Sequence, residues 1–339
     1  MRPDDPAVSA TPIDLPASEP PTLFVVVDTE EEFDWSAPFS RQNTSVTAMR
    51  HLGRAQQLFD RFGIVPTYVV DYPVASQPEG VAPLAEFAAA GRATIGAHLH
   101  PWVTPPHDED VSRPNSFAMN LPEALEAAKL ATMVETIGRA FGTRPQIYKA
   151  GRYGIAARTL ATLRSLGFTI DTSVNPHMNY TPEAGPDFRG FDARPCWLNH
   201  DLLEIPCTTG FAGFAGTALG SRLHAVALAA PPQLRAVGIL ARLGVTNRIM
   251  LSPEGSTLDE MRAITRALIA RGVRALTLSF HSPSVEPGHT PYVRSQADLG
   301  RFLQSIEQYF EFFFGELAGR TTTPLAFRAA VPPQRSVTE

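Results

Sequence analysis

The chain lacks the features that mark disulfide-rich, membrane-spanning and secreted proteins. Its two cysteines, Cys196 and Cys207, are too few for a disulfide framework and cannot supply a four-ligand zinc site alone. No apolar run approaches the roughly 20 residues that a membrane-spanning helix requires. The first residues lack the basic and then apolar order of a signal peptide. We therefore expect buried thiols, no membrane span and a cytoplasmic location.

An excess of positive charge is also missing. The chain carries 29 lysines and arginines against 34 aspartates and glutamates, which gives a formal net charge of -5. Non-specific binding of nucleic acid needs a basic surface, so we expect no nucleic-acid partner. With 339 residues, of which 44% are hydrophobic and 19% charged, the composition is that of a globular protein with a full core.

Apolar runs and amphipathic stretches alternate along the chain, which predicts a parallel sheet covered by helices. Residues 23–27 are apolar without interruption, as in a central parallel strand. The other expected strands are 64–70, 93–98, 146–149, 168–171, 203–206 and 275–281. The expected helices are 47–62, 81–90, 122–141, 156–166, 258–270 and 296–314. About seven strands favour a closed or nearly closed barrel in a single α/β domain.

Four segments depart from this alternation. Residues 1–20 are rich in Pro, Ala and Ser and are expected to be a disordered leader, and the residues from 321 onwards a loose tail. Residues 210–244, rich in Ala, Gly and Leu, predict one or two inserted helices. Residues 101–120 are polar and proline-rich, which predicts a loop over an active face. The barrel domain should therefore span 21–320.

The last expected helix holds an excess of aromatic residues near its end. Phe310, Phe312, Phe313 and Phe314 exceed what one helix face usually buries. They either pack inside the barrel or form a subunit contact, and the second alternative leads us to consider a homo-oligomer.

Ionisable residues gather where the expected strands end. Asp28 and Glu30 follow the first strand, and strand alternation sends both side chains to the same side. His98 and His100 lie at the end of the third strand, about 6–7 Å apart by the strand rise, a workable spacing for one metal ion. The carboxyl ends of parallel strands are where barrels and open α/β sheets place their chemistry.

Three more ionisable residues follow later strands: Arg152, Asp171 and His281. Each alone has an ordinary explanation, because arginine is common on surfaces, aspartate caps helices and histidine occurs in loops. The acids after the first strand could likewise begin a helix. Together, one group from each of four or five strand ends favours a shared catalytic site.

The order of these motifs resembles that of the NodB-homology polysaccharide deacetylases, carbohydrate esterase family 4. The matching segments are VDTEEEFDW, GAHLHPW and LSFHSPSVEPG, which most resemble the WalW-like branch. The resemblance covers about residues 22–315. It implies a distorted (β/α)7 barrel and a metal-dependent hydrolase that removes an acetyl or other acyl group from an N-acetylated carbohydrate or polysaccharide intermediate.

The resemblance also implies a metal site. Glu30 and His98 match metal ligands, but the family's second histidine falls at Trp102. His100 is the expected substitute, and His107 in the following loop is the other candidate. The implied cofactor is a divalent ion, first of all zinc, with cobalt, manganese and nickel as alternatives.

The catalytic roles implied by the resemblance fall on four residues. Asp28 matches the general base, Arg152 the arginine that orients it, and His281 the general acid; Asp171 matches a further acid more loosely. These roles suit amide hydrolysis, which needs water activated as a nucleophile and a proton for the departing amine.

Aromatic residues near these motifs are candidates for substrate contact. Trp35 and Trp102 flank two motifs and Tyr153 follows Arg152, so their rings could stack on a sugar, although tryptophan more often serves packing.

Two other functions stay open. The same barrel and metal could hydrolyse a small cyclic amide or ureide, with residues 101–120 and 210–244 as lids. The altered histidine motif would also suit a catalytically inactive barrel that binds a glycan or a protein.

Overall fold

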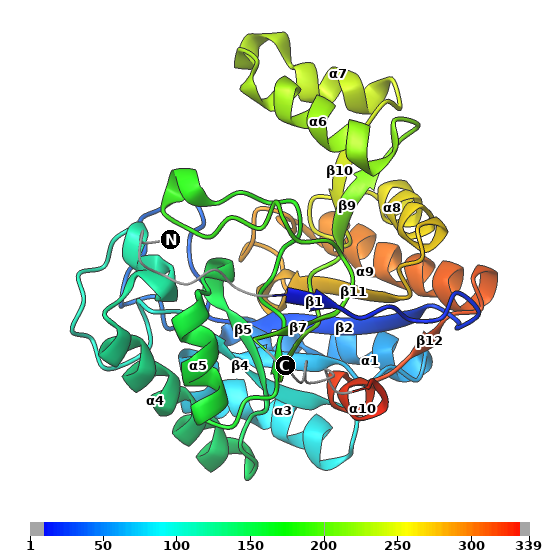
Figure 1. Cartoon of the computed structure of the whole chain (residues 1–339). Helices are drawn as coiled ribbons and strands as arrows, with labels where there is room; N and C mark the ends of the chain where they lie inside the picture. The colour runs from blue at the N-terminus through cyan, green and yellow to red at the C-terminus, as the bar shows by residue number, and fades with distance from the viewer. Residues whose placement is uncertain (1–9, 200, 333–339) are drawn as a thin grey trace, which may run out of the picture.

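The computed structural model describes residues 10–199 and 201–332, so the part of the expected leader before residue 10 and the part of the expected tail after residue 332 lie outside the described residues. Parallel strands form the centre of the molecule (Figure 1). Seven neighbouring strands run in the spatial order β11 (Ala275–His281), β2 (Thr22–Thr29), β3 (Thr67–Val70), β4 (Thr94–Leu99), β5 (Ile147–Ala150), β6 (Ile170–Asp171) and β8 (Leu202–Glu204).

Irregular chain fills the side of the sheet between β8 and β11. The Cys207 amide donates a hydrogen bond to the Val174 carbonyl at 2.9 Å. The Leu251 amide donates to the Thr208 carbonyl at 2.8 Å, and the Ser279 amide of β11 donates to the Leu251 carbonyl at 3.3 Å. The sheet therefore curves into a barrel whose last side is made by single hydrogen bonds. The predicted distorted α/β barrel is confirmed.

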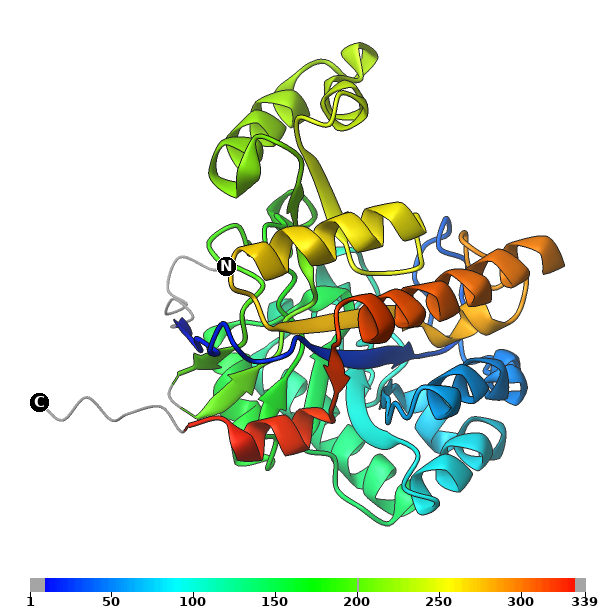
Figure 2. The same ribbon diagram turned by 90° about the vertical axis from the view of Figure 1, so that its right-hand side faces the viewer.

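Helices cover the outer face of the sheet (Figures 1 and 2). They are α1 (Gly53–Arg61), α2 (Tyr72–Ser76), α3 (Pro78–Ala89), α4 (Glu123–Phe141), α5 (Ala157–Ser165), α8 (Leu258–Ala270) and α9 (Gln296–Phe310). Short 3-10 turns lie at Thr47–His51, Pro114–Ser116, Ala118–Asn120, Gly151–Tyr153, Thr181–Glu183 and Ser282–Val285. Of these seven covering helices, only α2 was not expected; the Asp71 carboxylate begins it by accepting a hydrogen bond from the Val74 amide at 2.8 Å.

Strand β2 is buried on both of its faces. Leu23, Val25 and Val27 belong to the core between the strands and the outer helices. Phe24 and Val26 belong to a second core inside the barrel. Because side chains alternate along a strand, Asp28 follows Val26 on the inner side and stands at the mouth of the barrel.

The opposite end of the barrel is covered by both ends of the described chain. β1 (Ala10–Pro12) pairs with β7 (Cys196–Leu198), which pairs with β8. After β12 (Arg320–Thr321) beside β2, α10 (Pro324–Ala330) brings Phe327 against Phe24, with ring centroids 5.2 Å apart. The expectations of a disordered leader and a loose tail are therefore wrong for these segments, whose few apolar residues complete the inner core.

The inserted segment stands away from the barrel. β9 (Thr209–Ala212) and β10 (Asn247–Met250) form an antiparallel pair that was not expected. They carry α6 (Gly216–Ala229), a 3-10 turn at Pro232–Leu234 and α7 (Ala236–Arg242), which project at the top of Figures 1 and 2.

The aromatic residues near the end of α9 are buried within the chain. The helix continues as a π-helical segment over Glu311–Glu316, and Phe310, Phe312 and Phe313 are at most 1% exposed. They pack inside and give no support to a subunit contact. Among the described residues, no helix is both long and apolar enough to cross a membrane.

Candidate active site

A pocket of about 740 Å³ opens at the carboxyl ends of the parallel strands. It gathers nearly all the residues that the sequence singled out. The expected residues that line it are Asp28, Glu30, Trp35, His98, His100, Trp102, Arg152, Tyr153 and His281. Asp171 is not among its lining residues, and His107 is exposed outside it.

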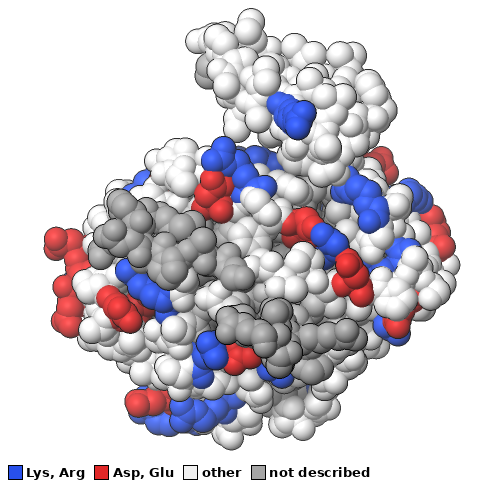
Figure 3. All heavy atoms as spheres, viewed as in Figure 1, with Lys and Arg blue, Asp and Glu red and all other residues white. Residues whose placement is uncertain are grey.

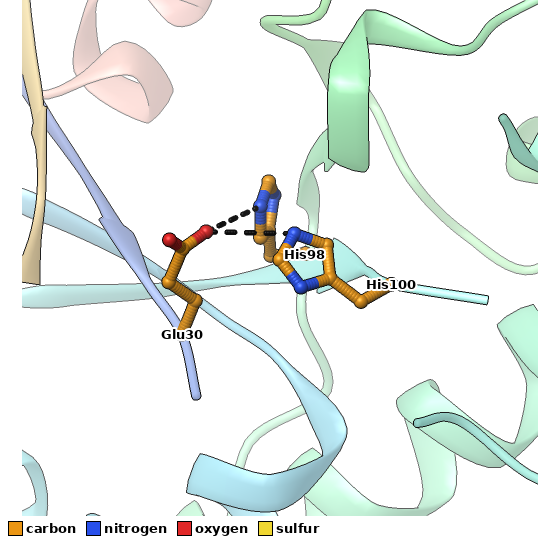
Figure 4. A group of neighbouring side chains, drawn as sticks. All are labelled: Glu30, His98 and His100. Carbon is orange, nitrogen blue, oxygen red and sulfur yellow. Dashed lines mark ion pairs between the residues drawn. The ribbon is translucent and has the colours of Figure 1, made fainter. Parts of the chain in front are cut away.

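Two histidines converge on one carboxylate in this pocket. The Nε2 atoms of His98 and His100 lie 3.6 and 3.4 Å from Glu30 Oε2 (Figure 4). All three side chains are nearly inaccessible, and one ligand atom from each lies within 4.8 Å of the others. Glu30 Oε1 is buried without a hydrogen-bond partner among the described residues. Burial raises the pKa of Glu30 to about 7, a cost that a bound cation would offset.

Hydrogen bonds orient both imidazoles with Nε2 towards Glu30. His98 Nδ1 lies 3.0 Å from the Lys149 carbonyl oxygen, and His100 Nδ1 lies 2.7 Å from Glu31 Oε2. Because these oxygens accept, each Nδ1 carries the proton and each Nε2 keeps a free lone pair. Burial lowers the pKa of both rings, that of His100 to about 4, so they are neutral at pH 7. The donor set fits a divalent metal ion.

Glu31 fixes the position of His100. Its Oε1 accepts a hydrogen bond from the Trp102 indole at 2.7 Å, and its amide donates to Asp71 Oδ2 at 2.7 Å. Trp102 is 2% exposed, which leaves little of its ring for a sugar; its contact supports the histidine instead. A Cβ atom on Gly151 would overlap the His100 ring, so glycine is required there.

Lys149, and not Arg152, is the cation that contacts Asp28. Its Nζ lies 2.6 and 2.7 Å from the two carboxylate oxygens, and both side chains are buried. Burial alone would raise the pKa of Asp28, but Lys149 and then His98 bring it below the ordinary value, so the carboxylate is ionised at neutral pH. Arg152 instead pairs with Glu183 and donates to Ser116 Oγ at 2.6 Å. The expected contact between Arg152 and Asp28 is wrong.

The turn after β5 explains why Lys149, and not Arg152, contacts Asp28. Arg152 and Tyr153 have φ angles of 53° and 62°, a left-handed conformation that is uncommon for residues other than glycine. The turn carries Arg152 to the pocket wall, where its guanidinium lies 4.1 Å from the centre of the Phe117 ring. Lys149, still within β5, points along the inner side towards Asp28.

His281 is held by an acid that the sequence reading missed. Its Nδ1 lies 2.6 Å from Glu254 Oε2, and its amide donates to both oxygens of Glu254 at 3.2 Å. Burial lowers the pKa of His281, but Glu254 and Glu30 outweigh it and raise the pKa to about 10. The ring is therefore protonated at neutral pH, with Nε2 directed to Asp28 Oδ2 at 3.8 Å.

Glu254 could have been found from the sequence. It follows the apolar run Ile249-Met250-Leu251, which has the same strand-then-acid pattern as the segment around Asp28. We expected inserted helices up to residue 244 and no strand between them and the helix that begins at residue 258, so this strand end was overlooked.

Asp171 belongs to a separate acid pair below the pocket. Its Oδ1 accepts a hydrogen bond from Ser173 Oγ at 2.6 Å, and Glu204 in the neighbouring strand accepts one from the Val174 amide at 3.0 Å. Both carboxyl groups are fully buried. Its proposed part in catalysis is not supported by this position.

Aromatic side chains border the mouth of the pocket. Trp35 is 37% exposed and packs edge-on against the His281 ring at 4.8 Å. Tyr292 lies 5.7 Å from Trp35, and Tyr153 stacks on Tyr180 at 5.3 Å. These rings offer flat apolar surface beside charged groups, an arrangement suited to a carbohydrate.

No family model matches the sequence, and no curated protein is significantly similar to it. The structure is similar to a protein from Mycobacterium smegmatis assigned as a polysaccharide deacetylase, with a TM-score of 0.52 and 14% identity over 96% of this chain and 95% of that one. A family 4 carbohydrate esterase from Streptomyces lividans has a TM-score of 0.43 and 10% identity, over 92% and 96% of the chains. A carbohydrate esterase family 4 pseudoenzyme from Bacillus anthracis has a TM-score of 0.41 and 7% identity, over 91% and 66%. The first likeness shows that the two chains share a fold.

Proposed function

We propose that this protein is a metal-dependent hydrolase that removes an acetyl group from an N-acetylated carbohydrate. The observation that carries the proposal is the convergence of Glu30, His98 and His100 in the same pocket as Asp28 and His281. The pocket thus combines a metal-ligand set, an ionised carboxylate and a protonated imidazole. The fold shared with a protein assigned as a polysaccharide deacetylase supports the reaction class.

Glu30, His98 and His100 would hold the divalent ion, and we expect zinc because imidazole and carboxylate ligands suit it. When bound, such an ion supplies a Lewis acid that makes water nucleophilic at neutral pH and polarises a carbonyl group.

The chain's own residues would manage the protons. Asp28, kept ionised by Lys149, is placed to accept a proton from the attacking water. His281, kept protonated by Glu254, is placed to donate a proton to the departing amine nitrogen. His281 Nε2 and Asp28 Oδ2 are 3.8 Å apart, so acid and base face the same small volume.

The size and lining of the pocket favour a carbohydrate substrate over a small cyclic amide. Its volume of about 740 Å³ exceeds what a single small ring fills. Trp35 and Tyr292 provide stacking surface, while Arg113 and Glu183 provide polar groups on the same wall. The sequence motifs most resemble the WalW-like branch, which is associated with cell-envelope polysaccharide, and this resemblance further supports an envelope-polysaccharide intermediate as the substrate.

The proposal is tested by measuring acetate release from N-acetylglucosamine oligomers and acetylated polysaccharides, beside metal content by elemental analysis. We expect about one zinc ion per chain and activity that falls at least 100-fold in Asp28→Asn and His281→Asn. Asp259→Asn, whose side chain is 95% exposed and does not line the pocket, is the matched control.

Unchanged activity in Asp28→Asn or His281→Asn would overturn the assigned roles. Hydrolysis of cyclic amides or ureides but of no sugar would transfer the same site to the other substrate class. Glycan binding without hydrolysis in the metal-loaded protein would contradict the enzyme and favour a binding protein.

A further inference from the structure

The segment of residues 213–246, which comprises α6, α7 and their connections, is called the helical arm below. It projects from the barrel on β9 and β10 (Figures 1 and 2). Nine large hydrophobic side chains are exposed in the described part of the chain, and seven belong to the arm. These seven are Phe214, Leu219, Val226, Leu228, Leu234, Ile239 and Leu243, each at least 50% exposed. The other two border the pocket, so the arm is the main apolar surface described.

The arm also differs from the rest of the chain in charge. No aspartate or glutamate occurs between Glu204 and Glu254, although the whole chain has a formal net charge of -5. The arm instead carries three exposed arginines, Arg222, Arg235 and Arg242. In Figure 3 its visible surface is uncharged apart from a basic patch. The arm thus combines exposed apolar side chains with arginines and has no acidic residue. Such a surface is complementary to a partner with an anionic surface and an apolar interior.

Exposed apolar side chains lie on two opposite sides of α6. Leu219 and Val226 are seven residues apart and therefore lie on the same side of a helix with 3.6 residues per turn. Leu228 is nine residues from Leu219 and lies on the opposite side. A flat protein partner would cover one of these sides and leave the other in water, whereas the fluid interface of a bilayer can adapt to an irregular apolar surface.

We propose that the helical arm docks the protein on an anionic lipid bilayer, with the arginines at the headgroups and the apolar side chains below them. The 14 residues of α6 span about 21 Å, which is less than the roughly 30 Å of the hydrocarbon core, so the arm lies in the interface without crossing.

A second copy of the chain is a poorer partner for the helical arm than an anionic bilayer. Two arms packed on each other would bring Arg222, Arg235 and Arg242 towards the same residues of the partner, with no acid in either arm to compensate.

Docking would also bring the pocket close to the lipid. Met250, the last residue of β10, lines the pocket, so the strand that carries the arm ends at the edge of the pocket. The docking proposal itself does not rest on the proposed reaction and is tested by binding alone.

The full chain should be sedimented with vesicles of equal parts phosphatidylglycerol and phosphatidylcholine, and with vesicles of phosphatidylcholine only. We expect binding to the first that weakens in high salt, and at least tenfold weaker binding to the second. Arg222→Gln/Arg235→Gln/Arg242→Gln should weaken binding by roughly 100-fold, because each arginine near an anionic surface contributes about fivefold. Arg139→Gln/Arg144→Gln/Arg301→Gln removes the same charge from other exposed positions and should bind nearly as the unaltered protein does.

Leu228→Glu/Ile239→Glu should also weaken binding by roughly 100-fold or more, while Gln296→Glu/Gln304→Glu, with the same added charge on exposed residues of α9, should not. Cys196 and Cys207 are buried, so a fluorophore can be attached selectively at Leu228→Cys. Nitroxide-labelled lipids should quench it, and should not quench a fluorophore at Gln304→Cys.

Absence of binding to the anionic vesicles would overturn the proposal. So would a concentration-dependent dimer, seen by sedimentation equilibrium, that becomes monomeric in Leu228→Glu/Ile239→Glu and does not bind vesicles. Equal effects of the two arginine triples would show that net charge, and not the arm, determines binding.

Discussion

At the scale of single residues, the contact between Lys149 and Asp28 keeps a carboxylate ionised inside the barrel. Both groups are buried, so removal of the lysine leaves an uncompensated charge. We expect Lys149→Met to lower the free energy of unfolding by about 3 kcal/mol and activity by roughly 100-fold or more. Urea unfolding and acetate release measure the two effects.

A double variant separates stability from catalysis. Asp28→Asn/Lys149→Met has no buried charge at this position and should recover most of the stability, but none of the activity. Arg152→Gln breaks a partly exposed pair with Glu183 and a hydrogen bond to Ser116 Oγ, and should cost about 1–2 kcal/mol, less than Lys149→Met. An equal loss of stability in Arg152→Gln and Lys149→Met would contradict the assignment of Lys149 as the cation that pairs with Asp28.

The residues at strand ends were predictable, but their partners were not. Asp28, Glu30, His98, His100 and His281 could be placed at one mouth because parallel strands end at the same edge. The Lys149 contact depends on a register across β2, β3, β4 and β5, and no local pattern encodes it. One signal was present, however. The chain has only two lysines, Lys129 and Lys149, and buried lysines are rare unless they are paired.

At the scale of elements, α10 completes the inner core of the barrel. Phe327 is 5% exposed and packs edge-on against Phe24 of β2. We expect Phe327→Ala to lower the free energy of unfolding by about 3 kcal/mol, because the cavity left under α10 lies between a strand and a helix that cannot close it fully. Urea unfolding measures the loss.

The matched control is Ala326→Ser, on the exposed side of the same helix, which should change stability by less than about 0.5 kcal/mol. Similar unfolding curves for Phe327→Ala and Ala326→Ser would mean that α10 adds nothing to the core. The sequence could not reveal this helix, because one phenylalanine and one leucine among threonines and alanines give no periodic pattern.

The pair of strands β6 and β8 holds two buried acids, Asp171 and Glu204. Burial and then the Asp171 carboxylate raise the pKa of Glu204 well above its usual value, and burial raises that of Asp171. The folded state therefore binds protons that the unfolded state has released. This contribution to stability is fully present below the unfolded pKa and is lost as pH rises towards the folded pKa.

We expect the free energy of unfolding to fall between pH 5 and pH 8, and Glu204→Gln to flatten that slope by up to about 1.4 kcal/mol per pH unit. A glutamine keeps the acceptor for the Val174 amide and can donate to Asp171. Urea unfolding across this range provides the measurement, with the exposed Asp259→Asn as control. Parallel slopes in the unaltered protein and Glu204→Gln would exclude this acid pair as the source.

At the scale of the whole molecule, the candidate metal site joins strands that are not neighbours. Glu30 follows β2, whereas His98 and His100 come from β4 and its end, with β3 between them. The unfolded chain does not hold these groups together, so an ion that binds them stabilises the folded state. At 100 times its dissociation constant, zinc should stabilise by about 2.7 kcal/mol, or about 4 °C in melting temperature for a chain of this length.

Histidine variants show whether the effect belongs to this site. His98→Ala/His100→Ala should lose the zinc-dependent shift, while His51→Ala/His107→Ala, which removes two histidines outside the cluster, should keep it. Glu31→Gln retains the ligands but loosens the support of His100, so we expect an affinity for zinc 10–100-fold lower. If His51→Ala/His107→Ala abolished the shift and His98→Ala/His100→Ala retained it, the ion would lie elsewhere. Because the melting temperature reports binding without any substrate, this result is independent of whether the reaction itself has been identified correctly.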